Sequence, residues 1–291
     1  MIFIRDFKKQ YLNALSDIKT FSNSWLNWSP VLRKKFKNIK GQGVLDLGDD
    51  LSNIFKTNSS KARGQGDLSG GGNAWECFIV WYLNLIYWET PVIITRTNKK
   101  FVPQCIRDVL TVTISNNQTN TESDILLFSI PDHQLLNSSE VSIEALNNHL
   151  SSRLRDVDIF NLQCKTNWND NSQIPMLWDM IYNSKSNLPN VSVGINGVNP
   201  NSVNSFKYGF ATVPSNKLSN FKPTSICVLR VKNLTGGNYW GHPTKSSIAS
   251  SLKELPNRNY TQVFQGGIAA HINNQISLNN NLLKNFLDLS W

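Results

Sequence analysis

The sequence predicts an α/β fold in which a central mixed β-sheet is flanked by helices and preceded by a helical N-terminal region. Three observations predict it. Apolar residues have helical spacing in the first forty positions, one later segment is apolar nearly all round, and short β-branched runs then alternate with helical segments. With 291 residues, 40% of them hydrophobic, the chain can fill a large core. No internal repeat or long polar linker divides it, so we expect one domain, residues 1–291.

Residues 1–45 are predicted to be helical and basic. Apolar side chains recur there at three- and four-residue steps, at Phe7, Tyr11, Leu12, Leu15 and Ile18. A basic run follows, at Arg33, Lys34, Lys35, Lys37 and Lys40. This run could contact phosphates, but it could equally be the solvated face of a helix.

The segment KARGQGDLSGGGN, residues 61–73, is rich in glycine but does not match a phosphate-binding loop. It lacks GK[ST], a preceding strand and the spacing of a dinucleotide fingerprint. We interpret it as a loop before a helix from Asn73 to about Trp88, with Asn73 as the cap. That helix is apolar on nearly all sides and should be central. Glu76, in its first turn, is either held by the helix dipole or points into a site.

Strand and helix patterns alternate from residue 91 onward. Strands are predicted at 91–97, 108–114, 124–130, 158–165, 191–196, 208–213 and 225–231. Helices are predicted at 142–154, within an insertion at 132–157, at 173–183, and around 246–255 and 276–289. The C-terminal part, residues 216–291, therefore combines a strand with a turn-rich stretch and helices.

The charge balance predicts a polyanionic partner. Lysine and arginine exceed the acids by nine and the pI is about 9.4, although only 17% of residues are charged. Nucleic acid fits such a positive field, while the alternative is that the excess only aids solubility. The four cysteines form no CxxC pair, so we expect reduced thiols. No signal peptide or membrane span is visible, and the asparagine-rich loops suggest an AT-rich bacterial genome, so we expect a bacterial cytoplasmic protein.

The stretch DIFNLQCK, residues 158–165, ends a predicted buried strand with polar residues. Because strand side chains alternate, Gln163 and Lys165 share a face while Cys164 turns the other way. Asp124 opens an earlier strand. Magnesium prefers oxygen ligands and retains several waters, so Asp124, the Gln163 amide and a backbone carbonyl such as that of Cys164 could hold it. With Lys165 near a bound water, this set suits phosphodiester hydrolysis.

Asp124 followed, after a gap, by Gln163-x-Lys165 at a strand end resembles the PD-(D/E)xK nucleases, most of all the type II restriction endonucleases. The resemblance spans residues 73–208 in order: a helix with an acid, a strand with Asp, a strand with QxK, then a helix and a strand. It implies a restriction-endonuclease-like catalytic core at 73–215, Mg2+-dependent cleavage of double-stranded DNA that leaves 5′-phosphate ends, and a homodimer. It also implies that Asp124 and Gln163 bind Mg2+, that Lys165 orients the attacking water, and that Glu76 can join the site.

The chain departs from the family pattern at two points. Gln163 stands where a carboxylate is usual, which removes a negative charge that Glu76 could supply. The gap from Asp124 to Gln163 is 39 residues, longer than a hairpin turn, so an insertion is required. If that assumption fails, three other acids are alternative metal ligands: Asp132, Asp156 and Asp158.

Base recognition is predicted from two loop-like stretches, since Asn and Gln can pair with adenine and Arg and Lys with guanine. The candidates are Asn196, Asn199, Asn201, Asn204 and Lys207 in the first stretch, and Asn238, Tyr239, His242 and Lys245 in the second. Turn formation is the alternative role for these asparagines. It is also the alternative for Asn169 and Asp170, which otherwise could support the metal site.

Two other functions stay open from the sequence. A repair or structure-selective nuclease would use the same fold and residues. A non-catalytic DNA-binding protein would instead hold Asp124 and Lys165 as an ordinary ion pair. The four isolated histidines do not predict a zinc site, and without a GxSxG motif the sequence does not predict acyl transfer.

Overall fold

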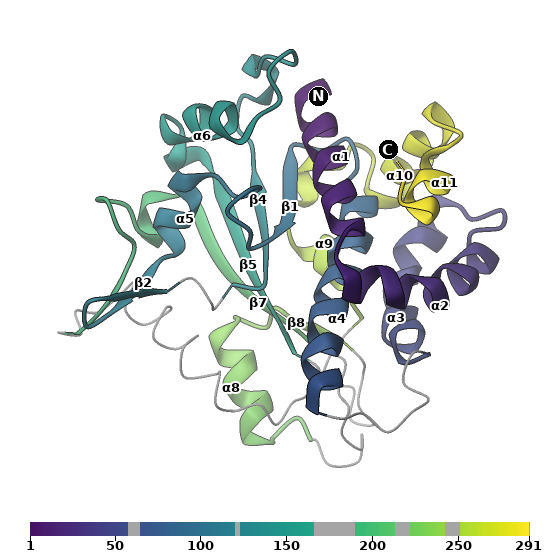
Figure 1. Cartoon of the computed structure of the whole chain (residues 1–291), viewed down its shortest axis with the longest axis horizontal. Helices are drawn as coiled ribbons and strands as arrows, with labels where there is room; N and C mark the ends of the chain where they lie inside the picture. The colour runs from purple at the N-terminus through teal and green to yellow at the C-terminus, as the bar shows by residue number, and fades with distance from the viewer. Residues whose placement is uncertain (58–64, 120–122, 166–189, 213–221, 242–250, 291) are drawn as a thin grey trace.

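Strand pairing in the computed structural model builds a five-stranded sheet in the order β1-β4-β5-β7-β8 (Figure 1). Its strands are β1 Val92–Arg96, β4 Ile125–Ser129, β5 Asp158–Lys165, β7 Ser205–Thr212 and β8 Tyr239–Gly241. Strand β4 runs antiparallel to β1 and β5, whereas β7 is parallel to β5 and β8 is parallel to β7. The predicted α/β class with a mixed central sheet flanked by helices is confirmed. The structure describes residues 1–57, 65–119, 123–165, 190–212, 222–241 and 251–290.

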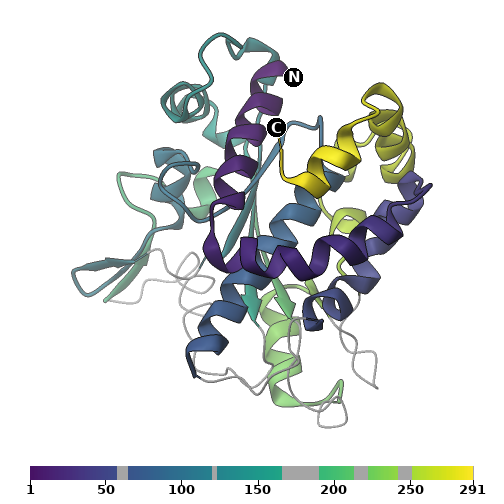
Figure 2. The ribbon, with the colours of Figure 1, turned by 45° about the vertical axis from the view of Figure 1, so that its right-hand side comes forward.

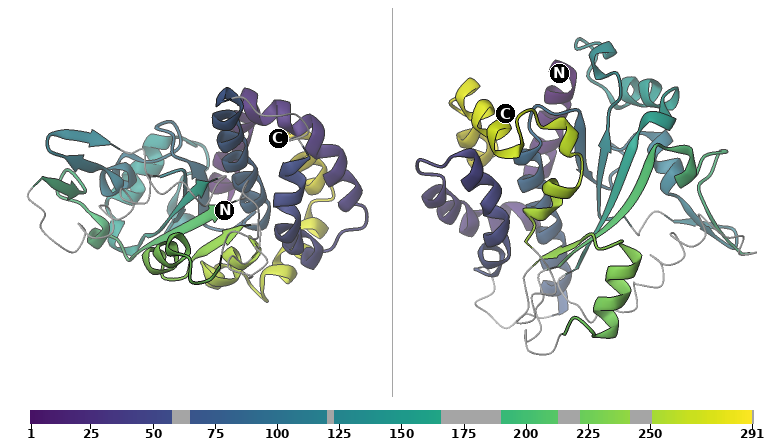
Figure 3. Two further views of the ribbon diagram at one scale, coloured as in Figure 1. Left: turned by 90° about the horizontal axis from the view of Figure 1, so that it is seen from below. Right: turned by 180° about the vertical axis from the view of Figure 1, so that it is seen from behind.

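Helices cover both faces of this sheet (Figure 1, Figure 3). On one side lie α5 Gln104–Leu110 and α6 Ile143–Ser151, and on the other lie α1 Ile2–Ser16 and α4 Gln65–Ile86. A further helical layer joins the two ends of the chain and packs on α4: α2 Lys19–Lys35, α3 Gly41–Lys56, α10 Ile268–Leu278 and α11 Leu282–Asp288 (Figure 2). The described residues also form α8 Ile226–Leu234 and α9 Glu254–Arg258.

The central helix is α4, as its all-round apolar pattern predicts. Within residues 74–86 every side chain except Glu76 is buried. Trp28 of α2 stacks on Phe78 with ring centroids 4.6 Å apart, and each such buried aromatic contributes about 1.5–3 kcal/mol through burial. Asn84 is also fully buried, and its Nδ2 donates to a carbonyl of β1 at 3.1 Å. This bond holds α4 against β1 at Asn84, the one amide side chain within residues 74–86.

Helix α4 begins at Gln65, eight residues before the predicted start at Asn73. Residues 65–73 of the glycine-rich stretch are therefore helical, and the interpretation of these residues as a loop is wrong. Glycine disfavours a helix by only about 1 kcal/mol per residue, and the long buried segment that follows outweighs this preference. Asn73 lies inside the helix, where its Nδ2 donates to Thr20 Oγ1 at 3.2 Å instead of capping the first turn.

Helix α3 was predicted only as far as residue 45, and Gly41, Gly43 and Gly48 weaken its helical pattern. Two of these glycines are required by packing. A Cβ atom at Gly41 would lie 2.0 Å from the carbonyl oxygen of Ala269, and one at Gly48 would lie 2.4 Å from the backbone nitrogen of Lys253. The glycines thus allow the backbone of α3 to approach α10 and the segment before α9.

Two predicted strands are wholly or partly helical. Residues 225–231 lie largely in α8, where Val228 and Val231 are buried while Leu229 and Arg230 are exposed. That spacing is helical, and a short apolar run alone does not distinguish the two structures. Residues 108–114 are divided between α5 and a short strand, β2 Val112–Ile114.

Strand β2 belongs to a second, three-stranded sheet with β3 Asn117–Thr119 and β6 Val191–Val193. This sheet projects from the body at the left of Figure 1. The predicted helix at 142–154 is confirmed as α6, with the Ser142 side chain accepting from Ala145 N at 3.1 Å. The predicted helix at 173–183 and residues 246–250 lie outside the described residues. None of the helices in the described part of the chain is both long and apolar enough to span a membrane.

Candidate active site

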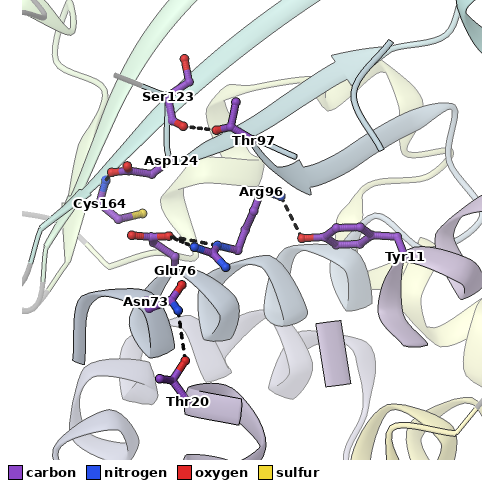
Figure 4. A network of polar contacts seen from close by, with 9 residues as sticks. All are labelled: Tyr11, Thr20, Asn73, Glu76, Arg96, Thr97, Ser123, Asp124 and Cys164. Carbon is purple, nitrogen blue, oxygen red and sulfur yellow. Dashed lines mark hydrogen bonds and ion pairs between the residues drawn. The ribbon is translucent and has the colours of Figure 1, made fainter. Parts of the chain in front are cut away.

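Asp124 lies at the junction of three strands. It directly precedes β4, and its carbonyl accepts a hydrogen bond from the backbone of Thr97, just after β1, at 3.2 Å. Its carboxylate Oδ2 accepts from the backbone N–H of Cys164 in β5 at 2.7 Å (Figure 4). Continuing the β4–β5 register by one residue sets Asp124 opposite Gln163. The structure therefore places Asp124 at the end of β5 where Gln163 and Lys165 lie.

The predicted insertion separates β4 and β5 in sequence but not in space. The two strands pair directly, and the chain between them forms α6 and two short 3-10 turns, His133–Leu135 and Leu154–Asp156. These elements lie beyond the end of the sheet opposite to Lys165, because β4 ends where β5 begins. The 39-residue gap is thus a hairpin with an insertion, as the sequence required.

The structure adds Arg96, a residue that the sequence analysis missed. Arg96 ends β1, and its Nε and Nη2 donate to Glu76 Oε2 at 3.0 and 2.8 Å (Figure 4). Its backbone N–H donates to the Tyr11 hydroxyl at 2.8 Å, so α1 is tied to the same point. The Arg96 and Glu76 side chains are only 26% and 17% exposed. The signal available in the sequence was an arginine that closes an otherwise apolar strand.

Four charged groups share one electrostatic environment at this point. Burial and then the charge of Asp124 raise the pKa of Glu76 to about 7, while Arg96 and Lys165 act in the opposite direction. Burial also raises the pKa of Asp124, against the lowering effects of Lys165, the Cys164 N–H and Arg96. Burial and the two acids raise the pKa of the Cys164 thiol well above its usual value, so the thiol stays protonated.

The sheet divides the candidate side chains between its two faces. Strand register puts Cys164 on the face of Arg96 and α4, and in Figure 4 its sulfur points to the side of the Glu76–Arg96 pair. Gln163 alternates with Cys164 and therefore lies on the opposite face, as does Lys165. Asp124 is bonded near the plane of the sheet, so its carboxylate lies between the two groups.

Gln163 belongs to a row of buried polar side chains on its face. It is only 2% exposed, and its Oε1 has no hydrogen-bond partner among the described residues. The same holds for both polar atoms of Asn161 and for the hydroxyls of Thr95 and Thr212, which register places on the same face. Buried polar atoms normally have partners, and bound water or an ion is a common explanation for those that have none.

A cation with oxygen ligands fits this end of β5. Asp124 has a second carboxylate oxygen besides the one bonded to Cys164, and Gln163 offers a buried amide oxygen next to it. Mg2+ retains several waters and needs few protein ligands. In the described ranges no three His, Cys, Asp or Glu side chains converge to hold a metal ion. The fitting set is therefore Asp124, Gln163 and a backbone carbonyl such as that of Cys164, while Glu76 is engaged with Arg96.

The alternative acids lie at the other end of the sheet. Asp158 begins β5, five residues before Gln163, which corresponds to about 16 Å along a strand. Its Oδ1 accepts from Asn204 Nδ2 at 2.8 Å. Asp132 and Asp156 lie in the insertion at that same end. None of the three is placed to share a cation with Gln163.

Several predicted base-reading residues have partners within the chain. Asn196 Nδ2 donates to Asp108 Oδ2 at 3.0 Å. Asn199 caps a short 3-10 turn, Pro200–Ser202, by accepting from the backbone N–H of Asn201 at 2.8 Å. Asn204 bonds Asp158 as described above. The turn-forming role that was the alternative for these asparagines is therefore present at Asn199.

Four of these candidates nevertheless share one surface cavity of about 610 Å³ beside β7: Asn201, Asn204, Lys207 and Asn238. Tyr239 begins β8. His242 and Lys245 lie outside the described residues, as do Asn169 and Asp170.

Other basic and ligand-forming groups are engaged elsewhere. In the N-terminal basic run, Arg33 pairs with Asp288, and Lys35 pairs with Asp50 at 2.5 Å. His149 and His271 each hydrogen-bond a main-chain carbonyl at 2.7 Å. Cys77, Cys105 and Cys164 are free thiols. Apart from Cys164, none of these groups is bonded to Asp124 among the described residues.

No family model, curated protein or solved structure matches this chain. The functional conclusion therefore depends on the geometry and the electrostatics of the site.

Proposed function

We propose that the chain is a Mg2+-dependent endonuclease for double-stranded DNA, with a restriction-endonuclease-like core over residues 73–215 and the sequence specificity of a type II restriction enzyme. The observation that carries the proposal is the hydrogen bond that holds Asp124 against β5, beside Gln163 and Lys165. The element order supports it: α4 with Glu76, β4 after Asp124, β5 with Gln163 and Lys165, and then β7 follow in the order that the family resemblance requires.

In this proposal Asp124 and Gln163 hold the cation, and the Cys164 backbone both fixes Asp124 and offers a carbonyl. Bound Mg2+ would supply positive charge at the scissile phosphate and lower the pKa of a coordinated water. Lys165 lies on the Gln163 face, where its ammonium can orient the attacking water and donate to the phosphate. Glu76 is bonded to Arg96, so it contributes negative charge near Asp124 without contacting the cation.

The distribution of charge along the sheet supports DNA at the Lys165 end. Beyond the opposite end, residues 132–158 contain five acids and two arginines. Residues 97–119, which follow the end of β1, contain three basic residues and one acid, and residues 222–234 contain three basic residues and no acid. A polyanion would therefore approach the end of the sheet that carries Asp124 and Lys165. We further propose that the protein acts as a homodimer on palindromic DNA sites in a bacterial cytoplasm.

The test is digestion of a mapped plasmid by the purified protein with and without Mg2+, followed by sequencing of the ends. We expect discrete fragments with 5′-phosphate ends only when Mg2+ is present. Lys165→Ala should not cleave but should still bind DNA. Lys284→Ala, which removes an exposed lysine of α11, is the matched control and should cleave as the wild type does.

Three outcomes would change the conclusion. A wild-type rate in Lys165→Ala would refute the site. Preference for ends or junctions over a fixed sequence would identify a repair or structure-selective nuclease. Specific binding that Mg2+ never converts into cleavage would identify a non-catalytic DNA-binding protein, although in the structure Asp124 bonds the Cys164 N–H rather than forming an ion pair with Lys165.

A further inference from the structure

A cavity of about 450 Å³ lies between α5 and the three-stranded sheet. Its lining includes Lys99, Gln104, Arg107, Gln118 and Thr119. Two of these side chains are positively charged, two are amides, and none of the described residues that line the cavity is acidic. The cavity is therefore suited to an anion with several acceptor oxygens.

The guanidinium of Arg107 is held in place by neutral acceptors. Its Nη1 donates to the carbonyls of Lys99 and Val102 at 2.9 and 2.8 Å, and its Nη2 donates to Gln104 Oε1. Asp108, the next residue in α5, is 7% exposed and accepts from two amide groups instead. In the described part of the chain, Arg107 thus presents a charge that the fold orients and no carboxylate neutralises.

The cavity adjoins the candidate active site. Lys99 follows Thr97 by two residues, which span at most about 7 Å, and the Thr97 backbone bonds the carbonyl of Asp124. On the other side of the cavity, Thr119 precedes Asp124 by five residues, or at most about 18 Å of chain. A DNA strand with one phosphate at Asp124 would therefore have neighbouring phosphates within reach of the cavity.

We infer that this cavity binds a backbone phosphate of the DNA, one that flanks the phosphate to be cut, and this inference rests on the proposed function. A phosphate accepts hydrogen bonds from a planar guanidinium in a fixed geometry and pairs with an ammonium as a point charge. Arg107 and Lys99 supply these two groups, and the Gln118 amide supplies a further donor. Because the contact is to the backbone, it adds affinity and positions the duplex without reading its sequence.

Duplex binding in the absence of Mg2+ tests the inference separately from cleavage. Fluorescence anisotropy is measured at several salt concentrations for the wild type, Lys99→Ala and the control Lys284→Ala. Loss of one phosphate contact reduces the slope of log K against log salt by about 0.9. Lys99→Ala should show this reduction with every duplex sequence, Lys99→Glu should bind more weakly still, and Lys284→Ala should keep the wild-type slope.

Lys99 is the residue to replace because its side chain is exposed, whereas Arg107 also fixes the loop around it. Wild-type affinity and slope in Lys99→Ala would overturn the inference and leave the proposed function standing. A wild-type protein that binds no duplex would overturn both. A loss limited to one duplex sequence would indicate a base contact and would overturn the assignment to the backbone.

Discussion

At the carboxyl end of β5, two groups of polar side chains on opposite faces of the central sheet differ in their hydrogen bonding: the Glu76–Arg96 pair and the Gln163–Asn161 row. On the α4 face, Glu76 accepts two hydrogen bonds from Arg96, whose backbone is bonded in turn by Tyr11. On the opposite face, Gln163 and Asn161 are buried, yet polar atoms of both have no partner among the described residues. Among the described residues, the Glu76–Arg96 pair therefore has its hydrogen-bond partners, whereas the Gln163–Asn161 row does not.

This difference indicates different roles for residues that the sequence grouped together. The Glu76–Arg96 pair fastens α4 to β1, and Arg96 also helps to lower the pKa of Asp124 against the effect of burial. An unsatisfied buried amide instead destabilises a fold by about 1–3 kcal/mol, unless bound water or a cation completes it. Within the proposed function, Glu76 therefore belongs to the supporting structure, Gln163 and Lys165 to the reacting side, and Asp124 to the boundary between them.

Among the predicted effects, the largest should be the loss of cleavage rate on replacement of Asp124. Asp124→Asn keeps an oxygen acceptor for the Cys164 N–H but removes the charge, so we expect the single-turnover cleavage rate to fall by about 10³-fold. Duplex binding without Mg2+ should be retained. Asp158→Asn, at the other end of β5, is the matched control and should cleave within a few-fold of the wild-type rate. Equal losses in both variants would show that the active site is not at the carboxyl end of β5.

Disruption of the Glu76–Arg96 pair should lower the stability of the fold more directly than it lowers the cleavage rate. Arg96→Met leaves the Glu76 carboxylate largely buried without its partner, and loss of one member of such a pair costs about 3 kcal/mol. Urea unfolding above neutral pH should show a lower midpoint with an unchanged slope. The double variant Arg96→Met/Glu76→Gln should regain part of the loss, because no unpaired charge remains. A single variant as stable as the wild type would show that the pair does not support the fold.

The pH dependence of the free energy of unfolding tests the environment of Glu76 while its bond to Arg96 is intact. The pKa of Glu76 is raised from 4.5 to about 7 in the folded protein, chiefly by burial, so the folded state retains a proton that the unfolded chain releases. The resulting stabilisation is complete below pH 4.5 and is lost as the pH rises through 7, by up to about 3 kcal/mol. Urea unfolding across this range should show a decline that Glu76→Gln lacks. Identical pH profiles for the two proteins would contradict this assignment.

The sequence predicted best those segments whose own pattern decides their structure. Residues 92–96, 125–129 and 158–165 are apolar, partly β-branched runs, and each forms a strand of the central sheet. It failed where the neighbours decide. The run at 225–231, predicted as a strand, fits either a strand or a helix until Val228 and Val231 are known to face the core. The glycines of α3 look like breakers until the close approach of other backbones explains them.

The same limit applies to the site. The alternation of Gln163, Cys164 and Lys165 follows from the strand period alone, and the place of Asp124 follows once its strand is assumed to pair with β5. Nothing in either segment marks Arg96 and Glu76 as partners, because their contact joins a helix to a strand twenty residues further along the chain. Whether an asparagine caps a turn or stays available to a ligand likewise depends on its neighbours.

The smallest expected effect is on the free energy of unfolding when Gln163 or Asn161 is replaced. The two positions are then distinguished by their response to Mg2+. Both lie on one side of β5 and are buried. Gln163→Leu removes an unsatisfied amide oxygen, and Asn161→Leu removes an amide whose oxygen and nitrogen are both unsatisfied among the described residues. The free energy of unfolding in the presence of a chelator should therefore stay within about 1 kcal/mol of the wild type or increase.

The response to Mg2+ then distinguishes the two positions. A cation held partly by Gln163 Oε1 stabilises the folded state by mass action, so thermal unfolding with and without Mg2+ should show a shift for the wild type and Asn161→Leu but not for Gln163→Leu. If Gln163→Leu retained the Mg2+-dependent shift in unfolding temperature, Gln163 would not be a ligand of the cation. Bound water would then be the explanation for the unsatisfied atoms of Gln163 and Asn161. If both variants lost the Mg2+-dependent shift in unfolding temperature, the cation would lie further toward the start of β5 than Asp124 can reach. The contrast between the Glu76–Arg96 pair and the Gln163–Asn161 row would then no longer support an active site at Asp124.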